Sequence, residues 1–214
     1  MYIPKHFKET DEQEIERFIR ENSFGIIISV QDGIPIATHI PFMFELKDNQ
    51  KILRAHIARA NEQKHSLTDG AKVLVIFPGP HTYISSTWYK NNEVPTWNFQ
   101  AVHAYGTLRL INDEELHKSL SDLVKTNEGE GGHDITSYPD DHVRKLMKGV
   151  IGFEITIEEL QAKYKLSQNK GEDDRQGVYK GLSEREDEQS QQVLEEMKKE
   201  RQRKKTFNEK GGNN

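Results

Sequence analysis

The sequence predicts a mainly β domain in which six or seven antiparallel strands close into a barrel, with helices at the periphery. Two observations support this fold class. Short runs of β-branched and aromatic residues, bounded by Gly, Asp, Asn or Pro, recur along residues 24–110 with only brief helical segments between them. A chain with this many short strands favours a closed barrel, because closure removes exposed strand edges.

Composition limits the class of protein further. Hydrophobic residues are 34% and charged residues 30% of the 214-residue chain, which is enough for one core with a polar excess elsewhere. The formal net charge of -5 predicts no overall attraction to nucleic acid, and the lack of cysteine excludes disulfides and thiolate chemistry. The first ten residues lack the apolar region of a signal peptide, and no apolar run is long enough to span a membrane. We therefore expect a cytoplasmic protein.

The first strands are predicted by turn chemistry. Strands over residues 24–30 and 34–44 flank Asp32-Gly33, a strong hairpin signal because Gly tolerates a positive φ. A third strand is expected over residues 51–57, followed by a short helix that Asn61 caps.

Three peripheral helices are expected around these strands. Thr10 begins a capping-box pattern for a helix over residues 11–22, and Asn112 caps a second helix. Pro139 opens a third helix at its first position, and a strand over residues 150–157 follows.

The stretch from residue 78 to 106 holds both tryptophans and organises the middle of the chain. Strands are expected over residues 73–77, 81–86 and 96–110. Alternation along the last strand places Trp97, Phe99, Ala101, His103 and Tyr105 on one face and Asn98, Gln100, Val102 and Ala104 on the other. Two antiparallel strands joined by an aromatic-rich loop could form the wall of a binding site for a flat ligand. The alternative, equally supported, is that these aromatic residues only form part of the apolar core.

The C-terminal segment differs in composition from the rest. We expect a barrel domain over residues 1–182, a polar helix over 183–205 that Ser183 caps, and a disordered tail over 206–214. The end of the helix is basic, which indicates either a solvated helix or an arm that contacts DNA phosphates. The candidate DNA contacts are Lys198, Lys199, Arg201, Arg203, Lys204 and Lys205.

Motifs for several other chemistries are absent or weak. A metal site could draw on His39, His56, His81 and His103, but no two histidines have a ligand-pair spacing on one element. The serines lack the context of a hydrolase nucleophile, and the Walker and Rossmann glycine patterns do not occur. No catalytic residue is therefore assigned.

Seven segments carry a family resemblance: MYIPKHF, ENSFGIII, DGIPIATHIPF, HIARAN, VPTWNF, AVHAYG and KYKLSQNK. They resemble the PaiB-type negative transcriptional regulators over residues 1–180. That family is similar to the FMN-binding split β-barrel proteins, which include pyridoxamine 5′-phosphate oxidase. The resemblance implies a homodimer with flavin sites at the subunit interface, and repression of genes for proteases and sporulation.

The resemblance also implies a set of flavin contacts. Phosphate contacts in such barrels come from the second strand, the third strand and the helix start that follows, and the flavin ring meets a later strand. The candidate cofactor-binding residues are Thr38, His39, His56, Arg59, Asn61, Gln63, Lys64, Trp97, Asn98 and Gln168. This chain departs from the oxidase at Glu62-Gln63, where the oxidase has an adjacent basic pair.

Two further functions stay open at the level of sequence. A flavin-dependent oxidoreductase and a haem-binding or haem-degrading protein of the same barrel type are the alternatives. An absorption spectrum would separate flavin bands from a haem Soret band. The homodimer is expected to use apolar surface from the 88–99 loop and from the strand that begins at Val73.

Overall fold

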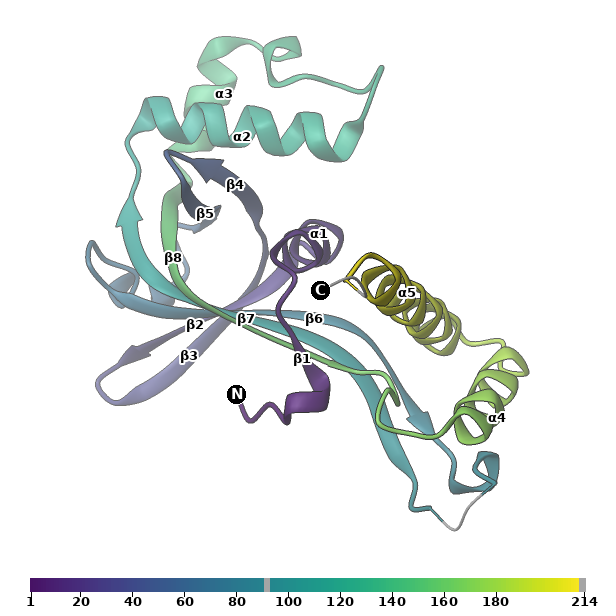
Figure 1. Cartoon of the computed structure of the whole chain (residues 1–214). Helices are drawn as coiled ribbons and strands as arrows, with labels where there is room; N and C mark the ends of the chain where they lie inside the picture. The colour runs from purple at the N-terminus through teal and green to yellow at the C-terminus, as the bar shows by residue number, and fades with distance from the viewer. Residues whose placement is uncertain (91–92, 212–214) are drawn as a thin grey trace. The chain divides into compact units, whose positions relative to one another are not determined.

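The computed structural model describes residues 1–90 and 93–211, with side chains through residue 204. Its strands form one sheet in the order β3-β2-β6-β7-β8-β5-β4, with β1 paired to β8 (Figure 1). The described strands are β1 (Lys8–Glu9), β2 (Phe24–Gln31), β3 (Ile34–Pro41), β4 (Met43–Lys47), β5 (Gln50–Ala58), β6 (Lys72–Ile84), β7 (Thr96–Leu110) and β8 (Val150–Lys165). The helices are α1 (Glu12–Glu21), α2 (Asp113–Glu128), α3 (Asp140–Met147), α4 (Glu172–Ser183) and α5 (Glu188–Gly211), with 3-10 turns η1 (Lys5–Phe7), η2 (Glu62–His65), η3 (Ser86–Trp88) and η4 (Ile135–Ser137). The predicted antiparallel β class with peripheral helices is confirmed.

The chain divides into two compact units, which are described separately. The barrel unit comprises Glu16–Phe77 and His103–Leu160. The ribbon unit comprises Met1–Ile15, Pro78–Val102 and Gln161–Asn214. The strands β6, β7 and β8 each contribute residues to both units.

Two tight hairpins build the barrel unit. Asp32 and Gly33 connect β2 to β3 with φ values of 53° and 79°, as the Asp-Gly signal predicts. Asp48 and Asn49 connect β4 to β5 with φ values of 50° and 62°. Positive φ at both central residues matches the twist of the flanking strands, so each hairpin has a fixed register.

The return strand expected over residues 34–44 is divided into β3 and β4. The break lies at Phe42, whose N–H donates to the carbonyl of Ser23 over 2.8 Å and whose ring is buried. The chain therefore leaves β3 and begins a second hairpin. The strand β3, at one end of the strand order, also contacts β5, which is next to the other end, and this contact curls the sheet into a barrel.

The core of the barrel unit is apolar and closely enclosed. Its buried side chains include Ile27, Ile40, Phe44, Leu53, Ile57, Val73, Val75, Phe77, Leu108, Phe153 and Ile155. Val73, Val75 and Phe77 are among them, whereas Leu74 and Ile76 lie on the opposite face of β6 and are half-buried. The strand that begins at Val73 therefore supplies both core and outward-facing apolar side chains, and its expected part in a dimer interface stays a prediction.

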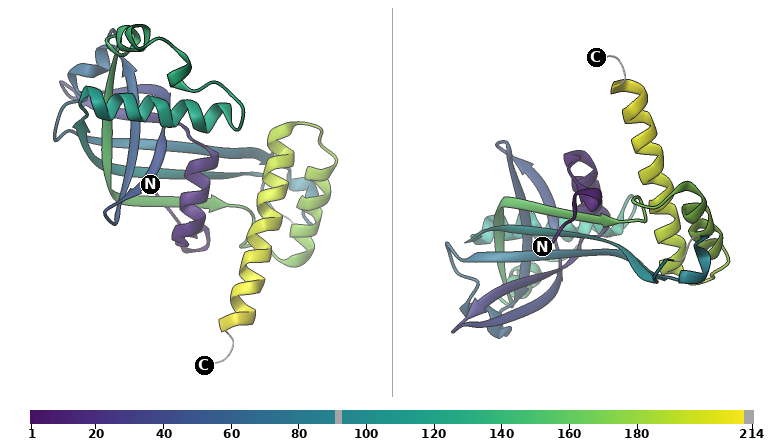
Figure 2. Two further views of the ribbon diagram at one scale, coloured as in Figure 1. Left: turned by 90° about the horizontal axis from the view of Figure 1, so that it is seen from above. Right: turned by 60° about the horizontal axis from the view of Figure 1, so that its bottom comes forward.

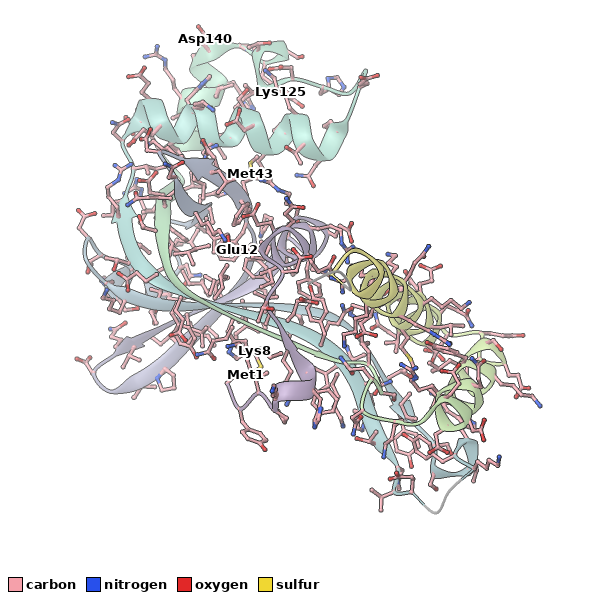
Figure 3. The ribbon with its side chains drawn as sticks, viewed as in Figure 1. Met1, Lys8, Glu12, Met43, Lys125 and Asp140 are labelled. Carbon is pink, nitrogen blue, oxygen red and sulfur yellow. The ribbon has the colours of Figure 1, made fainter. Side chains whose placement is uncertain are left out.

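Two helices of the barrel unit cover a smaller apolar cluster. The cap that was expected at Asn112 is present and forms a capping box, since the Asn112 side chain accepts from the Glu115 N–H and the Glu115 side chain accepts from the Asn112 N–H. Pro139 precedes α3 as its N-cap, one position earlier than expected. Figure 3 labels Lys125 on α2 and Asp140 at the start of α3. The cluster between the helices and the sheet contains Leu116, Ile135, Val143 and Met147.

The helix α1 begins one residue later than the sequence pattern suggests. The Asp11 carboxylate accepts from the N–H groups of Gln13 and Glu14 over 3.0 and 3.3 Å, so Asp11 and not Thr10 is the cap. An Asp side chain fills the same role as a Thr hydroxyl, which is why the pattern left the choice open. Among the described residues, no helix has both the length and the apolar character that crossing a membrane requires.

The two long strands of the ribbon unit differ in how well the sequence predicted them. The strand β7 has the expected bounds and the expected alternation: Asn98 and Gln100 are buried, and Trp97 is exposed. The two strands expected over residues 73–77 and 81–86 are one continuous strand, β6. Pro78 and Pro80 suggested a break, but the extended φ of proline is compatible with a strand.

The helices α4 and α5 pack against each other as a helical hairpin within the ribbon unit (Figure 2). The sequence pattern did not predict α4. It also placed the start of the last helix at Ser183, whereas Ser183 ends α4 and Asp187 caps α5 through the Ser190 N–H over 2.9 Å. The Ser183 hydroxyl instead donates to the Lys180 carbonyl within α4.

The helix α5 is packed and not solvated. Its apolar side chains Val193, Leu194 and Met197 are at most 4% exposed. The helix also continues to Gly211, beyond the expected end at residue 205, and residues 212–214 of the expected tail lie outside the described residues.

Trp88 holds α4 in place. The two glycines Gly177 and Gly181 allow this, because a Cβ added to Gly181 would lie 2.2 Å from the indole ring and one added to Gly177 would lie 1.9 Å from the Trp88 carbonyl. The Arg185 guanidinium lies over the same indole ring, 4.7 Å from its centroid. The tryptophan of the 88–99 loop is therefore occupied by its own chain.

A Gly181→Ala substitution tests this packing. The new methyl group overlaps the indole, so we expect the free energy of unfolding to fall by about 1–3 kcal/mol, as for other overpacked sites. Gly171→Ala is the matched control, because nothing lies within 4 Å of a Cβ at that position. Urea unfolding of both variants checks the prediction, which is contradicted if Gly181→Ala is as stable as the control.

Candidate functional site

The turn after β5 brings three of the predicted phosphate contacts together. The Asn61 side chain caps η2 by accepting from the Gln63 N–H over 2.9 Å. Its amide nitrogen donates to the Thr38 hydroxyl on β3 over 3.0 Å. The Thr38 hydroxyl keeps its own proton for a further acceptor, and Asn61 keeps one amide N–H. Thr38 and Asn61 thus form a small polar pair at the edge of the barrel unit.

Gln63, unlike its neighbours in the turn, points into the barrel unit. It is fully buried, and its amide nitrogen donates to the Ile27 and Ile36 carbonyls over 3.2 and 3.1 Å and to the Ser29 hydroxyl over 2.9 Å. These bonds join η2 to both strands of the β2–β3 hairpin. The Gln63 side-chain oxygen has no hydrogen-bond partner among the described residues. Gln63 therefore positions the turn that carries Asn61.

Two cations flank the same turn. The Arg59 guanidinium donates to the Lys148 and Val150 carbonyls over 2.9 and 3.0 Å, and the Lys64 ammonium donates to the Arg59 carbonyl over 2.9 Å. Each of these bonds uses one N–H, so three guanidinium N–H groups and two ammonium N–H groups stay available. Glu62, the departure from the oxidase pattern, is exposed.

A cleft lies beside Arg59, with a volume of about 790 Å³. Besides Arg59, the carboxylates Asp113, Glu114 and Asp140 and the cations Arg144 and Lys148 line it. The three carboxylates balance the three cations of the lining, so the cleft offers no net positive charge to a phosphate dianion. The donors that suit a phosphate are therefore those around η2.

The two predicted histidines of the barrel unit have contrasting surroundings. His39 is exposed and stacks on Phe24, with 6.5 Å between the ring centroids. His56 is half-buried in β5, and this burial lowers its pKa, so the imidazole is neutral at pH 7. Among the described residues, no three His, Asp or Glu side chains gather as metal ligands would.

The other three candidate flavin contacts belong to the ribbon unit. Trp97 is 53% exposed, whereas Asn98 is fully buried on the opposite face of β7 and donates to the Ser167 hydroxyl over 2.9 Å. Gln168 accepts from the Leu166 N–H over 2.7 Å and donates to the Tyr164 carbonyl, which closes the turn after β8. The expected pairing of an amide with a ring at one flavin edge is therefore not present at Trp97 and Asn98.

Most of the candidate DNA contacts on α5 are ion-paired within the ribbon unit. Arg201 pairs with Glu172 over 2.7 Å, and Arg203 pairs with Glu9 and Glu14 over 3.2 and 3.3 Å. The remaining described pairs join Lys199 to Glu196 and Lys204 to Glu200. Lys198 is exposed, and the side chain of Lys205 lies outside the described residues. DNA contact through α5 stays a prediction, with fewer uncommitted cations than the sequence suggested.

Several side chains near Trp97 were not among the predicted flavin contacts, although His81 was named as a possible metal ligand. The His81 and Tyr83 rings lie 6.2 and 6.1 Å from the Trp97 ring, between centroids. The Lys163 ammonium lies 5.2 Å from the Phe99 ring centroid. The sequence did contain a signal for these positions. In HTY (residues 81–83) and KYK (residues 163–165), the first and third residues alternate with an inward-facing one and therefore lie on the outward side of their strands.

Comparison with known proteins identifies the family. The sequence model of a family described as "Putative FMN-binding domain" matches residues 1–159. "Protease synthase and sporulation protein PAI 2" of Bacillus subtilis is 40% identical over 199 residues, which cover 92% of this chain and 96% of that protein. An uncharacterized protein of Aspergillus fumigatus is 30% identical, covering 85% of this chain and 90% of its own.

Solved structures of the same fold have much lower sequence identity. The flavocytochrome Anf3 from Azotobacter vinelandii aligns with a TM-score of 0.59 at 14% identity, covering 76% of this chain and 72% of its own. The FAD and heme binding protein from Mycobacterium smegmatis aligns with a TM-score of 0.55 at 15% identity, covering 74% and 73%. These likenesses show the split-barrel fold alone. The family match over residues 1–159 and the 40% identity to the Bacillus subtilis protein show that this chain belongs to the PaiB-type family of FMN-binding-domain proteins.

Proposed function

We propose that this protein is an FMN-binding regulator that represses genes for protease synthesis and sporulation. The observation that carries the proposal is the family match over residues 1–159, joined to 40% identity with a protein named for protease synthesis and sporulation. FMN bound to such a protein would supply a redox-active ring and a phosphate anchor. No side chain among the described residues is assigned a catalytic role.

The donors around η2 fit the phosphate of FMN. Thr38 and Asn61 each keep a proton to donate, and Arg59 and Lys64 add two positive charges with unused N–H groups. Charge-assisted hydrogen bonds of this kind are the strongest that a phosphate forms with a protein. The exposed side chain of Glu62 can stay in solvent while a phosphate sits at the turn. Thr38, Arg59, Asn61 and Lys64 are therefore the proposed phosphate contacts.

A flavin titration with Lys64→Ala and Arg59→Ala tests these contacts. We expect each variant to bind FMN about 1.5–3 kcal/mol more weakly, the cost of losing a hydrogen bond to a charged group. Lys145→Ala is the control, because it removes an exposed cation of α3 outside this turn. Flavin fluorescence measures the affinity, and thermal unfolding shows whether Arg59→Ala has also loosened the 148–150 turn. Equal FMN affinity in all three variants would remove Arg59 and Lys64 from the site, and a Soret band in the purified protein would contradict the flavin proposal itself.

We further propose a homodimer that uses the outer face of the β2–β3 hairpin. The cross-strand register places Phe24, Ile26, Ile28 and Val30 of β2 on the same face as Ala37 of β3. Phe24 and Val30 are 61% and 62% exposed. Packing against a second copy would remove these apolar side chains from water. A second copy of the chain that packs on this face would cover the exposed side chains of Phe24 and Val30.

The double variant Val30→Glu, Ala37→Glu tests this interface. Two buried carboxylates facing their symmetry mates would oppose association, so we expect the sedimentation mass at micromolar concentration to fall from a dimer to the 24.8 kDa monomer. Leu146→Glu is the control, since Leu146 is 61% exposed on α3 outside this face. A wild-type protein that sediments as a monomer refutes the dimer, and a double variant that stays dimeric places the interface elsewhere.

A further inference from the structure

One face of the ribbon unit presents aromatic rings to solvent across neighbouring strands. Trp97 and Tyr83 are 53% and 41% exposed, and their ring centroids lie 6.1 Å apart with the planes at 73°. The His81 ring lies 6.2 Å from Trp97 on its other side, tilted by 35°. Phe99 follows Trp97 by two residues on β7, and alternation places it on the same face. These rings form a strip over β6 and β7, which we name the aromatic face.

Lysines extend the aromatic face over β8 and β1. The Lys163 ammonium lies 5.2 Å from the Phe99 centroid and 5.7 Å from the Tyr2 centroid. Lys8 stands opposite Lys163 in the β1–β8 register, and directly opposed residues point to the same side of a sheet. Lys165 is the next residue on the outward side of β8, and burial together with the charges of Lys163 and Lys170 lowers its pKa.

These lysines differ from the cations of α5 in their partners. Within the described part of the chain, Lys8, Lys163 and Lys165 form no ion pair with a carboxylate. Lys163 donates to the Tyr2 carbonyl, and Lys165 donates to the Thr96 hydroxyl. Their positive charge is therefore uncompensated within the ribbon unit, although the whole chain has a net charge of -5. A local cationic surface on an acidic protein selects for an anionic partner.

We propose that the aromatic face binds single-stranded nucleic acid. Bases would stack on Trp97 and Tyr83, and the phosphates between them would contact Lys8 and Lys163, whose ammonium lies over the Phe99 ring. Aromatic rings on a sheet surface bind unpaired bases through their π-faces, and flanking cations follow the backbone. Several rings in a row suit successive bases, whereas one flavin needs a single stacking partner. This binding site is separate in its residues from the proposed phosphate contacts around η2.

Fluorescence anisotropy of a labelled oligothymidylate of about ten nucleotides, a length within the range of single-strand sites, tests the proposal on the full chain. We expect Trp97→Ala and Tyr83→Ala each to weaken binding by about 5- to 150-fold, the effect of losing one base stack. Lys163→Gln should lower the slope of log affinity against log salt by about 0.7, the value for one phosphate of a single strand. Circular dichroism of each variant confirms that the fold is retained.

Two matched controls locate the contact. Tyr138→Ala removes a ring that is 45% exposed in the barrel unit, and Lys145→Gln removes an exposed cation of α3; neither should change the affinity. A wild-type protein that does not bind the oligonucleotide at micromolar concentration and low salt overturns the proposal. Equal losses from Lys145→Gln and Trp97→Ala overturn it as well. Displacement of the oligonucleotide by one equivalent of FMN would assign the rings to the flavin, and equal competition by a blunt duplex would exclude base stacking.

Discussion

The two-residue alternation of β7 is the constraint on which the arrangement of the ribbon unit depends. Even-numbered residues from Asn98 to Val102 are at most 2% exposed, and the odd-numbered Trp97 is more than half exposed. The buried side of the strand is polar at Asn98 and Gln100, and a buried amide is costly unless it is hydrogen-bonded. Some other element must therefore supply partners on that side.

The helix α5 supplies those partners. The Gln100 amide donates to the Glu196 carboxylate over 3.1 Å, and Lys199 pairs with the same carboxylate over 2.7 Å. Asn98 reaches both Ser167 and the Met197 sulfur. A buried carboxylate is tolerated when hydrogen bonds and a counter-charge surround it. The polar residues that made α5 resemble a solvated helix are thus the ones that fix it to the sheet, together with Val193, Leu194 and Met197.

Local signals explain which elements the sequence could predict. Asp32-Gly33 and Asn112 act through their own backbone neighbours, so the first hairpin and the cap of α2 were predictable. The helix α4 was not, because its packing depends on two glycines that admit Trp88, from a segment about ninety residues earlier. Ser183 and Asp187 both match a cap pattern, and only the packing of α4 decides between them.

The candidate site shows the same division between local and distant information. The cap at Asn61 follows from its own turn, whereas the bonds that join Gln63 to both strands of the hairpin depend on the closed barrel. Residue type alone identified Arg59, Lys64 and the basic residues of α5 as cations. It could not show that Arg201 and Arg203 face carboxylates while Lys8 and Lys163 do not. Because an ion-paired cation must lose its partner before it can neutralise a phosphate, the unpaired lysines beside exposed rings are the better sites for an anion than the denser basic run of α5.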